Sequence, residues 1–141
     1  MRKMTDAELK DFLTVSARTG KLATVREDGR PHVVPVWYNL DGEDIVFSTW
    51  HTTVKAANMR RDPRVCLCVD EETPPYSFVM IEGTAALDGD LGQLRYWATR
   101  IAGRYMGAEL ADAYGERNSV EGELLVRVTP TRIIAQKGIA D

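Results

Sequence analysis

The chain has 141 residues, of which 44% are hydrophobic and 28% are charged, and its formal net charge at pH 7 is −3. This length fits one domain over residues 1–141, which can form a core without disulfides or a metal ion. The acidic balance argues against a nucleic-acid-binding protein, because such a protein needs a basic surface. No segment approaches the roughly 20 consecutive apolar residues of a transmembrane helix, and residues 1–10 lack the apolar stretch of a signal peptide. We therefore expect a cytoplasmic protein that does not enter a membrane.

The first third of the chain predicts one helix and three strands. Thr5 and Glu8 have the spacing of a capping box, which places a helix over about Asp6–Ser16. Strands are expected over residues 21–26, 30–40 and 44–49. Asp28-Gly29 predicts a two-residue type I′ hairpin, because both residue types tolerate positive φ angles, and Asp41-Gly42 predicts a second hairpin. The three strands would then form an antiparallel meander.

A short helix and two more strands are expected next. Thr52 or Thr53 can cap a helix over Val54–Arg61, and Pro63 ends it, since proline disfavours helical backbone at the preceding residue. Strands follow over residues 64–70 and 76–87. Gly83, inside the second of these strands, predicts a bulge or the close approach of another backbone segment.

The last third predicts a long helix from Asp90, a short helix over residues 108–114, and strands over 124–128 and 132–136 divided by Thr129-Pro130-Thr131. Asp90 and Gln93 repeat the capping-box spacing. Apolar residues then recur at helical intervals, namely Leu94, Trp97, Ile101 and Tyr105. Because the strands follow one another instead of alternating with long helices, we expect a mostly β fold, an antiparallel barrel with peripheral helices.

The two cysteines, Cys66 and Cys68, lie two positions apart on one predicted strand, so both side chains face the same side. Disulfide geometry is hard to reach between such neighbours, and we expect free, buried thiols in a reducing compartment. A metal site would need more ligands, and the only histidines are His32 and His51. We therefore expect no metal.

The segment from Ser48 to Asn58 is the first candidate site. Two hydroxyl residues end a predicted strand, and a threonine-rich turn then opens a helix with Lys55 in its first turn. The free N–H groups of a helix N-terminus, the hydroxyls and the lysine charge together suit a phosphate group. An ordinary capped helix with a solvated lysine explains the same residues. Neither a Walker loop nor a G-x-G-x-x-G motif is present, which excludes a P-loop and a Rossmann site.

Three further features admit both a ligand and a structural explanation. The prolines in Pro31–Tyr38 lack a backbone N–H, so that strand must lie at a sheet edge or where no hydrogen-bond donor is needed. A planar ligand could lie along such a strand, or its aromatic residues could pack in the core. Tyr76 and Phe78 can stack on a ligand or pack in a dimer interface. Arg100 and Arg104 lie one helical turn apart and can bind an anionic tail or stay solvated. No nucleophile with a neighbouring base is present, so any catalysis would come from a bound cofactor.

Short motifs in a fixed order link Gly20 to Gly83. They are Leu22-Ala23-Thr24, Asp28-Gly29-Arg30-Pro31-His32, Pro35-Val36-Trp37-Tyr38, Asp41-Gly42, Phe47-Ser48-Thr49, Lys55-Ala56-Ala57-Asn58-Met59-Arg60-Arg61-Asp62-Pro63-Arg64 and Glu82-Gly83-Thr84-Ala85. The series resembles the pyridoxamine 5′-phosphate oxidase-like superfamily of split β-barrel flavin-binding proteins. The run that begins at Lys55 makes the chain most similar, within that superfamily, to the F420-dependent (deazaflavin) reductases of the B type.

This resemblance implies a homodimeric split β-barrel with a cofactor at the interface between two subunits. It implies that the cofactor is coenzyme F420, with FMN as the alternative. The residues that it assigns to the cofactor phosphate are Ser48, Thr49, Thr53, Lys55 and Asn58. The residues that it places beside the tricyclic ring are Val34, Pro35, Val36 and Trp37. Tyr76 and Phe78 would come from the partner subunit, and no catalytic residue is implied.

Three functions remain open at this point. The first is an F420(H2)-dependent oxidoreductase that transfers a hydride between the deazaflavin and an unsaturated small-molecule substrate. The second is an FMN-dependent oxidoreductase of the pyridoxamine-phosphate-oxidase type. The third is a non-enzymatic protein that binds a flavin or a tetrapyrrole.

Overall fold

The structure is a computed structural model that describes all 141 residues. Its strands are β1 (Arg2–Lys3), β2 (Gly20–Val25), β3 (Pro31–Val36), β4 (Asn39–Asp41), β5 (Asp44–Trp50), β6 (Arg64–Glu71), β7 (Ser77–Asp88) and β8 (Glu123–Lys137). Its helices are α1 (Asp6–Thr14), α2 (Val54–Arg61), α3 (Leu91–Met106) and α4 (Ala108–Arg117). None of these helices is both long enough and apolar enough to cross a membrane.

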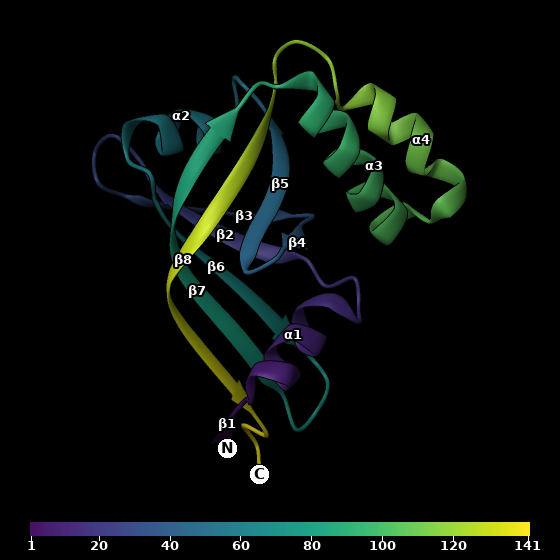
Figure 1. Cartoon of the computed structure of the whole chain (residues 1–141). Helices are drawn as coiled ribbons and strands as arrows, with labels where there is room; N and C mark the ends of the chain where they lie inside the picture. The colour runs from purple at the N-terminus through teal and green to yellow at the C-terminus, as the bar shows by residue number, and fades with distance from the viewer.

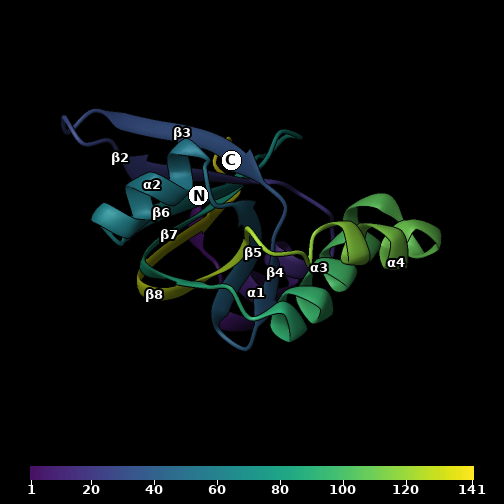
Figure 2. The same cartoon turned by 90° about the horizontal axis from the view of Figure 1, so that it is seen from above.

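The strands form one curled antiparallel sheet in the order β3-β2-β6-β7-β8-β5-β4, and β1 pairs with β8 (Figure 1). The helices lie around this sheet, and α3 and α4 project together to one side in Figure 1 and again in Figure 2. The predicted mostly β fold, a split antiparallel barrel with peripheral helices, is therefore confirmed.

The predicted meander of the first three strands is wrong. β3 pairs only with β2 at one edge of the sheet, whereas β4 pairs only with β5 at the opposite edge. The expected strand over residues 30–40 is therefore two strands, and the chain passes between the two edges at Trp37 and Tyr38. Tyr38 is fully buried, and its hydroxyl donates to the carbonyl oxygen of Leu13 at 2.8 Å. This long-range contact interrupts an apolar run that looks continuous in the sequence.

The two predicted hairpins both exist, but the first has a different turn. Its loop runs from Arg26 to Arg30, and only Gly29 has a positive φ angle, so a two-residue type I′ turn is wrong. Asp28 instead accepts hydrogen bonds from the backbone and the side chain of Arg30, at 3.1 and 2.7 Å. In the second hairpin, left-handed Gly42 follows Asp41, as expected for a tight connection.

β8 is one strand where two were predicted. It continues through Pro130, whose missing N–H falls beside a register shift between Glu82 and Gly83 of β7. A Cβ atom on Gly83 would lie 2.6 Å from the carbonyl oxygen of Thr129. The predicted bulge and close backbone approach at Gly83 are thus confirmed, and Pro130 lies beyond the part of β8 that pairs with β5.

Two apolar clusters hold the fold together. The barrel core contains fully buried side chains such as Leu22, Phe47 and Ile81, and α1 and α2 close it with Leu13 and Met59. A second cluster joins the outer face of the sheet to α3 and consists of Val46, Leu94, Trp97, Ile101 and Leu125. Both cysteines are free thiols as predicted, but they are only partly buried, and this burial raises the pKa of both.

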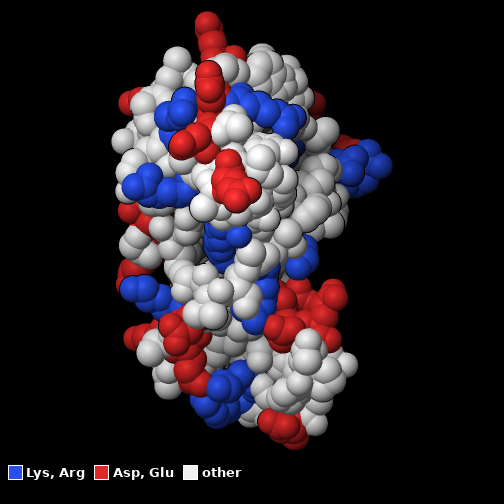
Figure 3. Space-filling view, turned by 90° about the vertical axis from the view of Figure 1, so that its right-hand side faces the viewer, with Lys and Arg blue, Asp and Glu red and all other residues white.

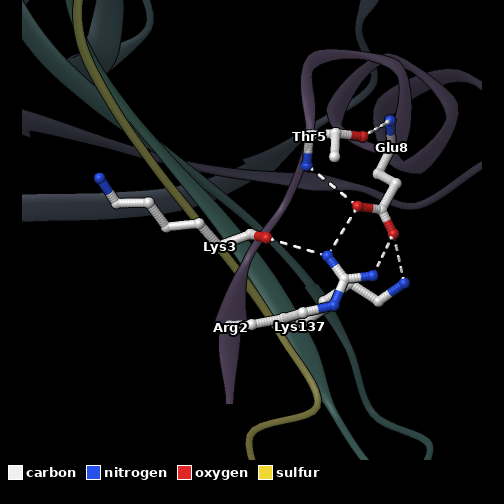
Figure 4. A network of polar contacts seen from close by, with 5 residues as sticks. All are labelled: Arg2, Lys3, Thr5, Glu8 and Lys137. Atoms are coloured by element: carbon white, nitrogen blue, oxygen red, sulfur yellow. Dashed lines mark hydrogen bonds and ion pairs between the residues drawn. The ribbon is translucent and has the colours of Figure 1, made fainter.

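The predicted N-terminal capping box is confirmed (Figure 4). The Glu8 backbone N–H donates to the Thr5 hydroxyl at 3.2 Å, and the Thr5 backbone N–H donates to the Glu8 carboxylate at 3.0 Å. The same carboxylate accepts from Arg2 at 2.8 Å and from Lys137. These contacts, above all the hydrogen bond from Arg2, hold the pKa of Glu8 well below its ordinary value. They fasten α1 to the end of β8.

Candidate functional site

The N-terminus of α2 follows directly from the end of β5. Thr53 is the residue that caps the helix, because its hydroxyl oxygen accepts from the Ala56 backbone N–H at 3.3 Å. The Thr53 hydroxyl also donates to the Trp50 carbonyl oxygen at 3.0 Å and lies 2.8 Å from the Thr49 hydroxyl. The two threonine hydroxyls predicted at this site are thus in contact, and they order the turn that leads into α2.

Lys55 stands in the first turn of α2 and is half-buried, but its amine has no hydrogen-bond or ion-pair partner in the chain. Burial lowers the pKa of Lys55, and the charge of Glu123 acts against that shift. Burial likewise raises the pKa of Glu123, against the opposing charges of Arg117 and Lys55. A half-buried, unpaired amine beside free helix N–H groups is suited to an anionic group such as a phosphate.

Ser48 and Asn58 do not join this cluster. Ser48 alternates with Phe47 and Thr49 along β5, so its side chain lies on the other face, which is the face that packs against α3. The Asn58 side chain is buried, donates to the Thr24 hydroxyl at 2.9 Å and accepts from Arg61 at 3.1 Å. Of these residues only Thr49 and Thr53 are in contact, Lys55 lies in the first turn of the helix that Thr53 caps, and contact of any of them with a cofactor stays a prediction.

Three of the four predicted ring-binding residues lie on β3, which is an edge strand as its prolines indicated, and Trp37 directly follows it. Val34 and Val36 face the barrel interior, whereas Pro35 and Trp37 face outward and are exposed. The indole of Trp37 stacks on the ring of Tyr105 from α3, with 5.2 Å between the ring centroids. Tyr105 was recognised in the sequence only as part of an apolar helix face, because nothing local links it to a strand far earlier in the chain.

The two arginines considered for an anionic tail differ in their surroundings. The Arg104 guanidinium donates to the carbonyl oxygens of Tyr38, Leu13 and Ser16 at 2.8, 2.7 and 2.8 Å. Arg104 is therefore a partly buried structural residue that joins α3 to the ends of other segments. The exposed Arg100 lies over the ring of Tyr96, 3.4 Å from its centroid. Basic and acidic side chains are interspersed on the face of the molecule seen in Figure 3.

Tyr76 and Phe78 lie at the far end of the barrel from α2. Phe78 pairs with Gln136 of β8, whereas Ser48 pairs with Leu125 of the same strand. The intervening length of β8 corresponds to roughly 35 Å at the rise of an extended strand. Within a single subunit, therefore, Tyr76 and Phe78 do not lie near the N-terminus of α2.

Tyr76 also has an unusual backbone. It is the only residue other than glycine with a positive φ angle, 63°, and its side chain is exposed. The C-terminal segment supports this conformation, because the Ile139 backbone N–H donates to the Tyr76 carbonyl oxygen at 3.1 Å. A strained, exposed aromatic residue that the surrounding structure holds in place is typical of a functional position.

Comparison with known proteins agrees with this architecture. A family model described as pyridoxamine 5′-phosphate oxidase matches residues 5–137. A conserved hypothetical protein from Mycobacterium tuberculosis is 30% identical, with a TM-score of 0.84 over 96% of this chain and 86% of that one. A protein named F420 reductase is 27% identical, with a TM-score of 0.68 over 87% and 94% of the two chains. The Vibrio cholerae heme-storage protein HutZ shares the fold at 21% identity and a TM-score of 0.75, over 100% of both chains. The chain belongs to the pyridoxamine 5′-phosphate oxidase family.

Proposed function

We propose that this protein is an F420-dependent oxidoreductase that reduces an unsaturated small molecule. The observation that carries the proposal is the half-buried amine of Lys55, which has no partner within the chain and lies in the first turn of α2 beside Thr53. Burying an unpaired amine is unfavourable, so an anionic ligand that meets it there gains a charge-assisted contact. The similarity to the protein named F420 reductase supports F420 as the source of that anion.

The chain's own residues fit the parts of such a cofactor. Thr53, Lys55 and the free N–H groups of α2 would hold the phosphate, and Pro35 of β3 and Trp37 directly after it would lie beside the ring. When bound, the reduced cofactor supplies a hydride to one carbon of a polarised double bond in the substrate, while solvent supplies the proton to the neighbouring atom. The residues around the ring orient the two molecules and keep water away from the reacting atoms.

A homodimer would complete the site. The outward faces of β2, β3, β6 and β7 carry no helix, since α2 contacts this part of the sheet from the inner side through Asn58 and Met59. Side chains on this outward face are mostly apolar and include Ala23, Val33, Cys68, Phe78 and Met80. Two copies packed through it would bury that surface and could bring Tyr76 and Phe78 of one protomer toward α2 of the other.

Titration of the purified protein with F420 and with FMN, followed by calorimetry, tests this function. We expect F420 to bind more tightly than FMN, and Lys55→Ala to weaken F420 binding by about tenfold, the effect of one charge-assisted contact. Lys10→Ala removes an exposed lysine of α1 and serves as the matched control. Unchanged F420 affinity in Lys55→Ala would exclude the phosphate site, and tight FMN with weak F420 binding would exclude the proposed cofactor.

Two further measurements separate an enzyme from a binding protein. Reduced F420 mixed with the protein and an enone should be oxidised faster than without the protein, at a rate that Lys55→Ala lowers. Binding of both cofactors with no oxidation by any enone or quinone would favour the non-catalytic binder. Sedimentation should show a dimer, and a monomer would exclude the shared site.

A further inference from the structure

The indole of Trp37 is held in one orientation by the end of α3. The Trp37 and Tyr105 ring planes lie within 2° of parallel, with the centroids 5.2 Å apart. The Tyr105 hydroxyl donates to the Arg18 carbonyl oxygen at 2.7 Å and accepts from the Tyr38 backbone N–H at 3.3 Å. Tyr105 therefore cannot rotate away without breaking two hydrogen bonds, and one face of the Trp37 indole is covered by a fixed ring.

The backbone next to Trp37 is fixed by Arg104, the residue that precedes Tyr105 in α3. The Arg104 guanidinium donates to the Tyr38 carbonyl oxygen at 2.8 Å, and it lies 4.6 Å from the centroid of the Tyr38 ring. Both the N–H and the carbonyl of Tyr38 are thus bound by α3, through Tyr105 and Arg104. The position of Trp37 is determined before any ligand arrives.

This rigid indole is nevertheless open on its other side. Trp37 is 40% exposed, although it is among the largest apolar side chains of the protein. It directly follows β3, whose outward residues Val33 and Pro35 belong to the face that the proposed dimer would bury. A fixed, exposed aromatic face that is already stacked on one side is suited to a second parallel stacking contact.

We propose that the Trp37–Tyr105 pair is a platform on which a planar, conjugated substrate stacks, and that Trp37 restricts the enzyme to such substrates. This inference rests on the proposed function. Thr24 contacts α2 through Asn58 and pairs with His32 of β3, five positions before Trp37, or roughly 16 Å along the strand. Trp37 is thus at the end of β3 away from the predicted phosphate site, where a hydride acceptor can approach the ring.

Direct binding of 1,4-naphthoquinone to the full-length protein tests the platform. It is measured by calorimetry with oxidised F420 present, so that no hydride is transferred, and again without F420. We expect Trp37→Leu to weaken naphthoquinone binding by about tenfold, the upper range for one aromatic stacking contact, while Trp37→Phe retains most of the affinity. Tyr96→Leu removes another exposed aromatic ring, from the outer surface of α3, and should leave the affinity unchanged.

The support of Trp37 by Tyr105 gives a second variant. Tyr105→Phe keeps the stacked ring but loses both hydrogen bonds, so it should weaken naphthoquinone binding less than Tyr105→Leu does. In turnover assays, Trp37→Leu should raise the KM for naphthoquinone about tenfold and the KM for the single-ring cyclohex-2-enone less than threefold.

Three outcomes of the binding and turnover measurements would overturn the platform. They are unchanged naphthoquinone affinity in Trp37→Leu, an equal rise of KM for both acceptors, and a loss of F420 affinity with naphthoquinone binding intact, which would assign Trp37 to the cofactor alone. Dissociation of the dimer by Trp37→Leu would also overturn it, because the partner subunit would then cover the indole. If wild-type protein binds no F420 but binds naphthoquinone through Trp37, the proposed function fails and the platform stands.

Discussion

The hydroxyl oxygens of Thr49 and Thr53 lie 2.8 Å apart, one at the end of β5 and the other at the N-terminus of α2. This contact joins the strand to the helix that follows it after a turn of three residues. Thr53 also caps the helix, so its hydroxyl already has partners within the chain. A phosphate near α2 would therefore rely on Lys55 and on backbone N–H groups more than on the hydroxyl of Thr53.

The first prediction separates the structural role of Thr53 from a ligand role. Thr53→Ala removes the cap and should lower the free energy of unfolding by about 1 kcal/mol, whereas Thr53→Ser should restore most of it. Urea unfolding measures both. Thr52→Ala is the matched control, because the exposed Thr52 makes no hydrogen bond through its side chain. Equal stability of Thr53→Ala and wild type would contradict the capping role.

The second prediction concerns stability at Lys55 without ligand. The folded pKa of Lys55 is lowered by burial, so the charged amine costs stability at every pH below its ordinary pKa of 10.5. Lys55→Met removes that charge and keeps the apolar stem. The melting temperature of the ligand-free protein should rise by a few degrees at pH 7, while F420 affinity falls. A lower melting temperature in Lys55→Met would show that the amine has a partner we have not identified.

The third prediction concerns Glu123, whose charge acts on the pKa of Lys55. Burial raises the pKa of Glu123 above its ordinary value of 4.5, and its negative charge opposes a bound phosphate. Glu123→Gln should therefore tighten F420 binding about threefold to tenfold at pH 7, the range for removing one repulsive charge at a partly solvated site.

The pH dependence of the Glu123 variant has a definite sign. Because the folded pKa is raised, protonation of Glu123 favours the folded protein, and that stabilisation is lost as the pH rises through the folded pKa. As the pH falls, the wild-type carboxyl becomes protonated, and the advantage of Glu123→Gln in F420 affinity should shrink. An affinity ratio between the two proteins that stays constant from pH 4 to pH 8 would exclude a charge effect.

Features that depend on neighbouring residues in the sequence could be predicted, whereas features that depend on residues far apart in the sequence could not. Capping by Thr5 and the bulge at Gly83 are signalled by a few neighbouring residues and were predicted, and the cap of α2 was narrowed to Thr52 or Thr53, of which Thr53 caps the helix. The break at Trp37 and Tyr38 depends instead on Arg104 and Tyr105 of α3, which only the folded chain brings to that point. Such contacts leave no local pattern, so they could not be predicted.

The candidate site shows the same limit. The sequence indicated that Thr53 and Lys55 lie together at a helix N-terminus, because both belong to one turn of chain. It also grouped Ser48 and Asn58 with them, although strand alternation turns Ser48 to the opposite face from Thr49, and Asn58 bonds to Thr24 from a distant strand. Glu123 enters the site from β8 and carries no sequence signal at all.

The fourth prediction concerns the bulge that keeps β8 continuous. A Cβ atom at Gly83 would lie 2.6 Å from the Thr129 carbonyl oxygen and 2.7 Å from a methyl group of Val128, which is fully buried. Gly83→Ala should lower the free energy of unfolding by about 2–3 kcal/mol, as expected for overpacking against backbone. Gly89→Ala is the control, since a Cβ atom there meets open space. Urea unfolding that shows equal losses for the two variants would contradict the close approach.

The last prediction concerns Tyr76, whose left-handed backbone costs stability. Tyr76→Gly removes that strain and should raise the free energy of unfolding by about 1 kcal/mol relative to Tyr76→Ala, which retains it. Both variants lose the aromatic ring, so both should bind F420 more weakly than wild type. Equal stability of the two variants would show that the conformation carries no strain.

Mixed dimers then show which subunit supplies the ring. If Lys55 of one protomer and Tyr76 of its partner form one site, a dimer of one Lys55→Ala chain and one Tyr76→Gly chain has one intact site and one doubly defective site. Random re-association of equal amounts should therefore restore tight F420 binding at roughly a quarter of all sites. A site built within a single chain would give no restoration, because every chain in the mixture carries one of the two substitutions.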